Sequence, residues 1–337
     1  MKIKFEAETD YCFLFNYNTG TSVTLEKKDF FIRDKGPNLL DVSITNRCDR
    51  GCNFCYRQSS ALGEDITLEN YRIILQNAND CGVQQIALGG GEPTLHPKFC
   101  DILKMTRVSG IVPNYSTNGG QLTPDILYCS TKYCGAIALS VYDDLSKYET
   151  IVKKITDYGI KLNLHLILRK DRIEEYIKIL RYPPEWITRI NAIIFLNYKP
   201  ANGNDSLCLK NCTEDIVSAF FESVKLFKAC GIGFDTCSIS FVCKKLDVDN
   251  SLYDFCEAGR KSAYINEKLE VYPCSFYKRG GISLKKDSLK NIWHTSHTFI
   301  EHRKLLEPKI QKCEHMNACR SGCPIYAINS CSECNTF

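Results

Sequence analysis

The sequence lacks the features that mark several large classes of protein. No apolar run approaches the roughly 20 residues of a membrane-spanning helix, so we expect no membrane protein. Lys and Arg number 43 against 39 Asp and Glu, and this net charge of only +4 gives little support for nucleic-acid binding. Residues 1–6 are partly basic but no apolar stretch follows them, so we expect no signal peptide.

Cysteine, in contrast, is abundant, with 20 in 337 residues. A secreted chain would use so many cysteines for disulfides, but disulfide-rich chains are usually short, and no export signal is visible here. A reducing cytoplasm with several iron–sulfur centres fits the cysteine content better. The length allows a large core, in one big domain or two.

Three of these cysteines, Cys48, Cys52 and Cys55, lie within eight residues, shortly after the strand-like run 39–45. One loop can therefore fold three thiolates around a single metal centre. Three thiolates cannot saturate a four-iron cluster, in which each iron takes its own ligand, so one iron would stay open. The alternative is a zinc knuckle, which Cys-x2-Cys alone would favour.

From residue 39 onward the pattern alternates between strand-like and helix-like segments. Thr67, Thr213 and Asp171 are candidate N-caps of the helices, and helical periodicity fades after Gly231. Six such units predict an α/β fold, a partial (β/α)6 open barrel built on a parallel sheet with right-handed crossovers. Ligands should then lie at the carboxyl ends of the strands. The strand-like runs are 39–45, 83–88, 111–116, 135–141, 160–168 and 191–197.

A glycine-rich segment, Gly89-Gly90-Gly91-Glu92-Pro93-Thr94, directly follows the second strand-like run. Consecutive glycines let the backbone approach a ligand closely, and the Glu92 carboxylate can accept hydrogen bonds from an ammonium group. Read alone, such a run is often only a tight turn. Its position one βα unit after the cysteine loop makes a ligand site the better interpretation.

The two motifs together, Cys-x3-Cys-x-Phe-Cys and Gly-Gly-Glu-Pro, resemble those of the radical S-adenosylmethionine (SAM) superfamily. The resemblance implies that Cys48, Cys52 and Cys55 hold a four-iron, four-sulfur (4Fe-4S) cluster whose open iron is chelated by SAM. It also implies that Gly89, Gly90, Gly91, Glu92 and Pro93 hold the methionine amino group, and that Phe54 lies near the adenine. Members of the family cleave SAM reductively to a 5′-deoxyadenosyl radical, which takes a hydrogen atom from a substrate carbon.

Weaker matches follow the later strands. Ser116 and Asn118, ending the third, resemble a turn beside SAM in the family, and Ser140 with Asp143, ending the fourth, stand where the family binds the ribose. Arg169 could meet the carboxylate of SAM or of a substrate. The alternative for the two segments is an ordinary strand-end turn, and for Arg169 it is a solvated side chain. Tyr198 and Lys199, ending the sixth strand, are candidates for the substrate side.

The C-terminal third resembles the SPASM extension, which carries auxiliary 4Fe-4S clusters in many radical SAM enzymes. The resemblance implies a first auxiliary cluster on Cys256, Cys274 and Cys323, with Cys237 or Cys243 as fourth ligand, and a second on Cys313, Cys319, Cys331 and Cys334. Two departures stand out, because Leu269 occupies the family's glycine position and Ile310 occupies a ligand position. The alternatives are that one cluster is absent or that this third binds zinc.

Residues 1–38 contain two strand-like runs, 11–15 and 21–25, joined by turn residues. They predict a β-hairpin that covers the bottom or side of the main domain, or one that docks a peptide by strand addition. We therefore expect three parts: the hairpin extension at 1–38, the barrel core at 39–232, and the auxiliary-cluster domain at 233–337.

The resemblance implies a cytoplasmic enzyme that matures a ribosomally made peptide, by oxidative crosslinking or a related change. It would take electrons from a flavodoxin or a ferredoxin. The alternatives are a sulfatase substrate (formylglycine formation), a small molecule, or peptide epimerisation with Cys237 as the hydrogen donor. From another class, the chain could be a non-catalytic iron–sulfur or zinc protein, although the segment 89–94 argues against that.

Overall fold

The computed structural model describes residues 3–8, 11–17, 22–26, 31–201, 203–249, 253–306 and 323–326. The predicted ligands of the second auxiliary cluster, Cys313, Cys319, Cys331 and Cys334, lie outside the described residues. The first auxiliary set, including Cys323, lies within them.

The centre of the molecule is a ten-stranded sheet in the order β10-β9-β8-β7-β6-β5-β4-β11-β12-β13. From β4 to β10 each strand pairs in parallel with the next one along the chain. The predicted α/β fold with a parallel sheet is confirmed, and β10 adds a strand to the six predicted. These strands are β4 (Leu39–Thr45), β5 (Gln85–Gly90), β6 (Val112–Thr117), β7 (Ile137–Val141), β8 (Leu162–Leu168), β9 (Ala192–Asn197) and β10 (Gly231–Phe234).

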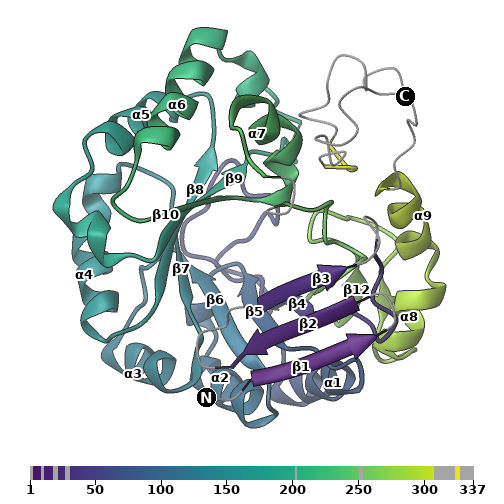
Figure 1. Ribbon diagram of the computed structural model, residues 1–337. Helices are drawn as coiled ribbons and strands as arrows, with labels where there is room; N and C mark the ends of the chain where they lie inside the picture. The colour runs from purple at the N-terminus through teal and green to yellow at the C-terminus, as the bar shows by residue number, and fades with distance from the viewer. Residues whose placement is uncertain are drawn as a thin grey trace.

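Helices connect these strands and cover the outside of the curved sheet (Figure 1). Thr67 and Thr213 are N-caps as predicted, because each side chain accepts a hydrogen bond from a backbone N–H in the first helical turn. The Asp171 prediction is wrong: Arg172 holds the N-cap position, and the Asp171 carboxylate pairs with Arg169. The helices are α1 (Leu68–Asp80), α2 (Phe99–Val108), α3 (Pro124–Tyr133), α4 (Glu149–Asp157), α5 (Ile173–Arg181) and α6 (Glu214–Leu226).

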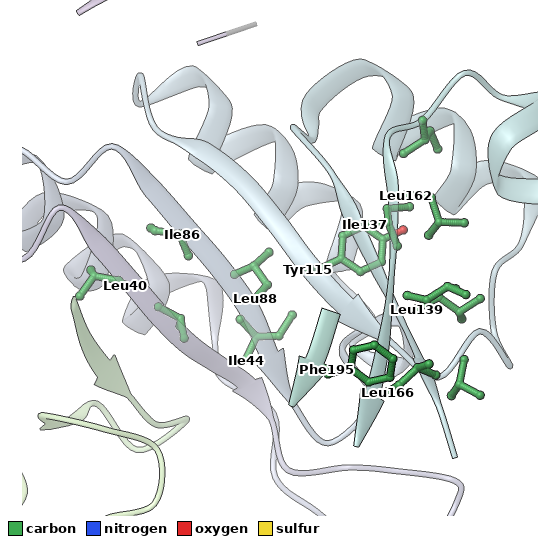
Figure 2. Close-up of a cluster of buried hydrophobic side chains, with 14 of the residues drawn as sticks. Leu40, Ile44, Ile86, Leu88, Tyr115, Ile137, Leu139, Leu162, Leu166 and Phe195 are labelled. Atoms are coloured by element: carbon green, nitrogen blue, oxygen red, sulfur yellow. The ribbon is translucent and has the colours of Figure 1, made fainter. Parts of the chain in front are cut away.

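Alternate residues of each strand point to opposite faces of the sheet. Leu40, Val42 and Ile44 of β4 belong to the buried core between sheet and helices, where Figure 2 shows Leu40 and Ile44 with their counterparts from β5 to β9. Burying each such side chain contributes about 1.5–3 kcal/mol. Asp41 and Ser43, which alternate with them, line a cavity on the other face. The hydrophobic pattern thus determines which side chains can reach a ligand.

The C-terminal part extends the same sheet. β11 (Ser262–Ile265) pairs in parallel with β4, and β12 (Glu270–Tyr272) and β13 (Ile282–Ser283) continue the sheet antiparallel. Three helices lie beyond the point where helical periodicity fades, and our patterns did not predict them: α7 (Ile239–Lys245), α8 (Leu289–Thr295) and α9 (His297–Leu306). Of these helices, α8 packs against α1 and α9.

The N-terminal residues form an antiparallel sheet of β1 (Ile3–Glu8), β2 (Tyr11–Asn16) and β3 (Ser22–Glu26), so the predicted hairpin is present with one more strand. Tyr11, Phe13 and Phe15 of β2 are buried together with Val112, the first residue of β6. This sheet therefore packs near the amino ends of the barrel strands, opposite the end where the cysteine loop follows β4.

The turn between β11 and β12 places Leu269 at φ +65°, a conformation that favours glycine, while its side chain is fully buried. We predict that Leu269→Gly is more stable than Leu269→Ala by about 0.5–1 kcal/mol, because glycine removes about 1–2 kcal/mol of left-handed strain. Both variants lose the same core contact. Urea denaturation measures the difference.

Leu40 in β4 is an equally buried control with ordinary strand geometry. There, Leu40→Gly should be less stable than Leu40→Ala. The same order at both positions would contradict the claim that Leu269 is strained.

Candidate active site

A cavity of about 460 Å³ lies at the carboxyl ends of the parallel strands. It exists because several inward-facing strand residues are small, among them Ala87, Gly89, Ser116 and Ser140. In a filled barrel these positions carry bulky branched side chains. The volume falls within the range of small-molecule sites, about 300–1,000 Å³.

The three predicted thiols, Cys48, Cys52 and Cys55, all line this cavity and are half-buried. Burial raises the pKa of the Cys48 and Cys52 thiols, and for Cys52 the neighbouring Arg50 partly offsets it. Thiols with raised pKa values bind a metal centre as thiolates only when its positive charge compensates their burial.

Hydrogen bonds hold the cysteine loop against the rest of the barrel. The Cys48 N–H donates to the Ser60 carbonyl at 2.9 Å, which closes the loop on itself. At its far end, the Arg57 guanidinium forms an ion pair with Glu267 at 2.5 Å and donates to the Tyr264 hydroxyl. The turn and strand of the C-terminal part thus help to position the loop.

Among the described residues, no three His, Cys, Asp or Glu side chains lie close enough together to hold one metal ion. A single zinc ion draws its ligands to about 2.0–2.3 Å. A 4Fe-4S cluster binds each thiolate through a different iron, so it suits thiols spread around one wall of a cavity. The donor set of Cys48, Cys52 and Cys55 fits such a cluster.

The glycine segment forms the adjoining wall and is joined to the backbone that leads into the cysteine loop. The Gly91 N–H donates to the Thr45 carbonyl, and the Glu92 N–H donates to the Arg47 carbonyl, each at 2.8 Å. A Cβ at Gly91 would lie 2.1 Å from the Arg47 oxygen, so glycine is required there. At Gly89 a Cβ would meet nothing within 4 Å and would enter the cavity.

Glu92 is almost fully buried, and its carboxylate joins the ends of two strands. Its Oε2 accepts the Asn118 N–H at 2.7 Å, and its Oε1 accepts the hydroxyls of Thr94 at 2.5 Å and Thr117 at 2.8 Å. Burial raises the pKa of Glu92, and these donors oppose that shift. Asn118 in turn donates to Asp49 at 2.9 Å, which links β6 to the cysteine loop.

The other predicted residues divide into two groups. Phe54, Ser116, Asn118 and Ser140 line the cavity, as do the predicted substrate-side residues Tyr198 and Lys199. Pro93, Asp143 and Arg169 are not among the lining residues.

Contacts within the chain hold these three residues in place. Pro93 is buried at the start of a short 3₁₀ helix. Asp143 lies 3.5 Å from Arg50. Arg169 pairs with Asp171 and covers the Phe54 ring, its guanidinium carbon 4.5 Å from the ring centroid. Contacts of Asp143 and Arg169 with SAM stay predictions.

The structure brings together Cys237, Cys256, Cys274 and Cys323 from distant parts of the chain. A hydrogen bond between Cys237 and Cys323 raises the pKa of the first thiol and lowers that of the second. Burial raises the pKa of Cys274 to about 11, with Cys237 among the nearby charges. Cys256 interacts electrostatically with both Cys237 and Cys274.

A buried ion pair lies between this thiol group and the cavity. The Lys199 ammonium is 3.2 Å from the Asp235 carboxylate and covers the Phe276 ring at 4.7 Å. Burial alone would lower the pKa of Lys199, but Asp235 and the thiols raise it above its usual range.

Sequence reasoning missed several polar residues that line the cavity, among them Asp41, His165 and Asp235. The available signal was their position in or directly after strands whose alternate neighbours are apolar. Burial lowers the pKa of His165 to about 4, so it is neutral near pH 7.

Asp41 gives the site a pH dependence. Its side chain is exposed to the cavity, but the protein around it displaces part of its hydration, and this desolvation, with the Glu257 charge, raises its pKa from 3.8 to about 6. The unfolded chain releases this proton at lower pH than the folded chain, so Asp41 lowers stability progressively from about pH 4 to pH 6. We predict that Asp41→Asn stabilises the protein above pH 6 and that the gain disappears towards pH 4. Thermal midpoints measured across this range test it.

The full pKa shift would correspond to a gain of about 3 kcal/mol in the free energy of unfolding. Because the carboxyl is open to water in the cavity, we expect a gain of about 1 kcal/mol, which raises the thermal midpoint by about 2 °C. A gain that is the same at pH 4.5 and pH 7.5 would contradict the assignment of a raised pKa. Asp157→Asn, which removes a largely exposed carboxylate paired with Arg189, is the charge-matched control.

Two family models match the chain. The model of the radical SAM superfamily matches residues 42–182, and that of the SPASM iron–sulfur cluster-binding domain matches residues 256–324. The chain belongs to the radical SAM superfamily. It is a SAM-dependent iron–sulfur enzyme with a SPASM domain, as the two sets of motifs predicted. None of the described helices combines the length and hydropathy needed to cross a membrane.

Relatives of this radical SAM chain match most of its length. PqqA peptide cyclase of Xanthomonas euvesicatoria pv. vesicatoria is 22% identical over 288 residues, which is 79% of this chain and 77% of the relative. Mycofactocin maturase MftC of Mycobacterium tuberculosis is 22% identical over 321 residues, 85% of this chain and 78% of the relative.

Solved structures share the fold of this radical SAM chain. Streptococcus suis SuiB bound to S-adenosylmethionine superposes with a TM-score of 0.71 at 15% identity, over 95% of this chain and 94% of SuiB. SuiB bound to its precursor peptide SuiA gives the same TM-score at 16% identity.

Proposed function

We propose that this enzyme matures a ribosomally made peptide by taking a hydrogen atom from one of its residues, most simply to form an oxidative crosslink. The observation that carries the proposal is the extent of one cavity. Its lining runs from the cysteine loop to Ser275 and Phe276, directly after Cys274. A substrate in this cavity would lie between two groups of thiols, so it could lose an electron to a second centre after losing a hydrogen atom.

In this proposal Cys48, Cys52 and Cys55 hold the 4Fe-4S cluster, and residues 89–92 hold the methionine end of SAM. When bound, the cluster supplies the electron that splits SAM, and the deoxyadenosyl group released takes a hydrogen atom from the substrate. The protein positions these groups through the Glu92 and Asn118 hydrogen bonds. Phe54 offers an apolar face for the adenine, and the enclosed walls limit water.

The choice of a peptide as substrate rests on similar proteins whose names point to peptides or to maturation. PqqA peptide cyclase matches 79% of this chain and mycofactocin maturase 85%, and SuiB has been seen with a precursor peptide. Electrons would come from a flavodoxin or a ferredoxin.

The thiol group of Cys237, Cys256, Cys274 and Cys323 suits the first auxiliary 4Fe-4S cluster, and its geometry favours Cys237 over Cys243 as fourth ligand. We predict that Cys237→Ala lowers the iron content by up to about four per chain, whereas Cys243→Ala leaves it unchanged. Iron assay with the visible absorbance of the same samples measures this. The reverse result would move the fourth ligand to Cys243.

The same comparison tests epimerisation, in which Cys237 would return a hydrogen atom instead. If Cys237→Ala keeps all its iron and fails only in hydrogen return, the ligand assignment is wrong. The hydrogen bond from Cys237 to Cys323 supports ligation.

The experiment on the substrate uses anaerobically reconstituted enzyme, SAM, a strong reductant and the synthetic peptide encoded by a short reading frame beside the gene. We expect 5′-deoxyadenosine together with a peptide that has lost two hydrogen atoms. An unchanged peptide mass with deuterium uptake from heavy water would favour epimerisation. Modification of a sulfatase peptide instead would favour formylglycine formation.

A further inference from the structure

Asp41 lies on the cavity side of β4, between two neighbouring strands. Its register partners are Ala87 on β5 and Tyr264 on β11. Because Ala87 is small, the Asp41 side chain stays exposed, and it lines the cavity.

Among the described residues that line the cavity, the other charged groups already have partners. Arg50 pairs with Asp143, Arg57 with Glu267, and Lys199 with Asp235. The Glu92 carboxylate, which also lines the cavity, accepts several hydrogen bonds. Within the described part of the chain, Asp41 has no side-chain hydrogen bond or ion pair, so the cavity holds one uncompensated carboxylate.

The surroundings of Asp41 place it between the two groups of thiols. Burial raises the pKa of Tyr56, which directly follows Cys55, and that of Cys274 in the auxiliary group, and the nearby Asp41 charge adds to both shifts. The Tyr56 and Phe276 rings stack with their centroids 4.4 Å apart and line the same space. The parts of these rings that line the cavity give the carboxylate an apolar neighbour, which suits the aliphatic stem of a cationic side chain.

We propose that Asp41 binds a cationic side chain of the substrate, a primary ammonium or guanidinium group, and so orients the peptide in the cavity. A neutral donor would leave the carboxylate charge uncompensated once the bound substrate displaces water from the cavity, which is unfavourable. A cation neutralises it and forms a charge-assisted hydrogen bond. This inference rests on the proposed peptide-modifying function and gives it a specificity: the residue held beside the reacting carbon, or next to it, is basic.

The test is binding, measured by calorimetry on anaerobic, cluster-loaded enzyme saturated with SAM. The probes are Nα-acetyl-lysine N-methylamide, its arginine analogue, and the norleucine analogue, which has the lysine stem without the charge. We expect one of the basic probes to bind wild type at least about tenfold more tightly than norleucine, as one charged hydrogen bond provides. In Asp41→Asn this preference should fall below about twofold, with norleucine binding unchanged.

Asp41→Glu should retain most of the preference, and Asp157→Asn, which removes an equal charge far along the chain, should retain all of it. Equal preference in Asp41→Asn and wild type, or no preference in wild type, would overturn the proposal. Loss of SAM affinity in Asp41→Asn would also overturn it, by assigning Asp41 to the cofactor. Deoxyadenosine formation is measured on the same samples. The proposed function predicts deoxyadenosine whether or not the probes bind, so this measurement separates failure of the Asp41 proposal from failure of the proposed function.

Discussion

Replacing Cys48, Cys52 and Cys55 together by alanine is expected to abolish 5′-deoxyadenosine formation and to remove about four irons per chain. The three thiols come from one loop, and among the described residues that line the cavity they are the only cysteines. Without the cluster, the electron that splits SAM has no route to the SAM molecule. Product analysis by chromatography and an iron assay on the same sample measure both effects.

The matched control replaces three half-buried cysteines elsewhere, Cys100, Cys212 and Cys230, by alanine. Their loss should leave the iron content and the deoxyadenosine rate within about twofold of wild type, because cysteine at such positions is ordinarily a small hydrophobic residue. If the loop variant kept its full iron content, the assignment of the cluster to this loop would be wrong.

The second large effect is a contrast between two neighbouring glycines. Gly91→Ala is expected to destabilise the protein by about 3 kcal/mol or more, because the new methyl would lie 2.1 Å from the Arg47 carbonyl oxygen. Gly89→Ala should change stability by less than about 1 kcal/mol, since its methyl enters open space. That space is the cavity, so Gly89→Ala should weaken SAM binding by about tenfold.

Denaturation curves and SAM titrations of both variants test this contrast. Neither Gly89 nor Gly91 has a positive φ, so the two variants differ in steric contact and not in left-handed backbone strain. If Gly89→Ala bound SAM as wild type does, the methionine end of SAM would lie elsewhere in the cavity.

Local patterns predicted the main features of this fold. The six strand-like runs became β4 to β9 because their alternate residues form one hydrophobic core with the helices. The cysteine loop and the glycine segment came together because both follow neighbouring parallel strands. Chain order alone determines that neighbourhood.

Long-range contacts set the features that were missed. The pairing of β11 with β4 joins residues more than 200 positions apart, and no local pattern specifies it. The contact between Cys237 and Cys323 has the same origin. Asp41 looks like an ordinary polar residue in a half-buried strand, and only the surrounding small side chains leave its carboxyl open to a cavity. The caps of α1 and α6 were predictable because a Thr side chain bonds within its own turn.

The most direct test of the central claim is one sample of wild-type enzyme, purified without oxygen and reconstituted with iron and sulfide. Iron and zinc are counted, and 5′-deoxyadenosine is measured after SAM and a strong reductant are added. We predict deoxyadenosine from a protein that holds about twelve irons per chain, as three four-iron clusters require. Zinc in place of iron, or no deoxyadenosine from a fully loaded sample with candidate peptides present, would contradict the account.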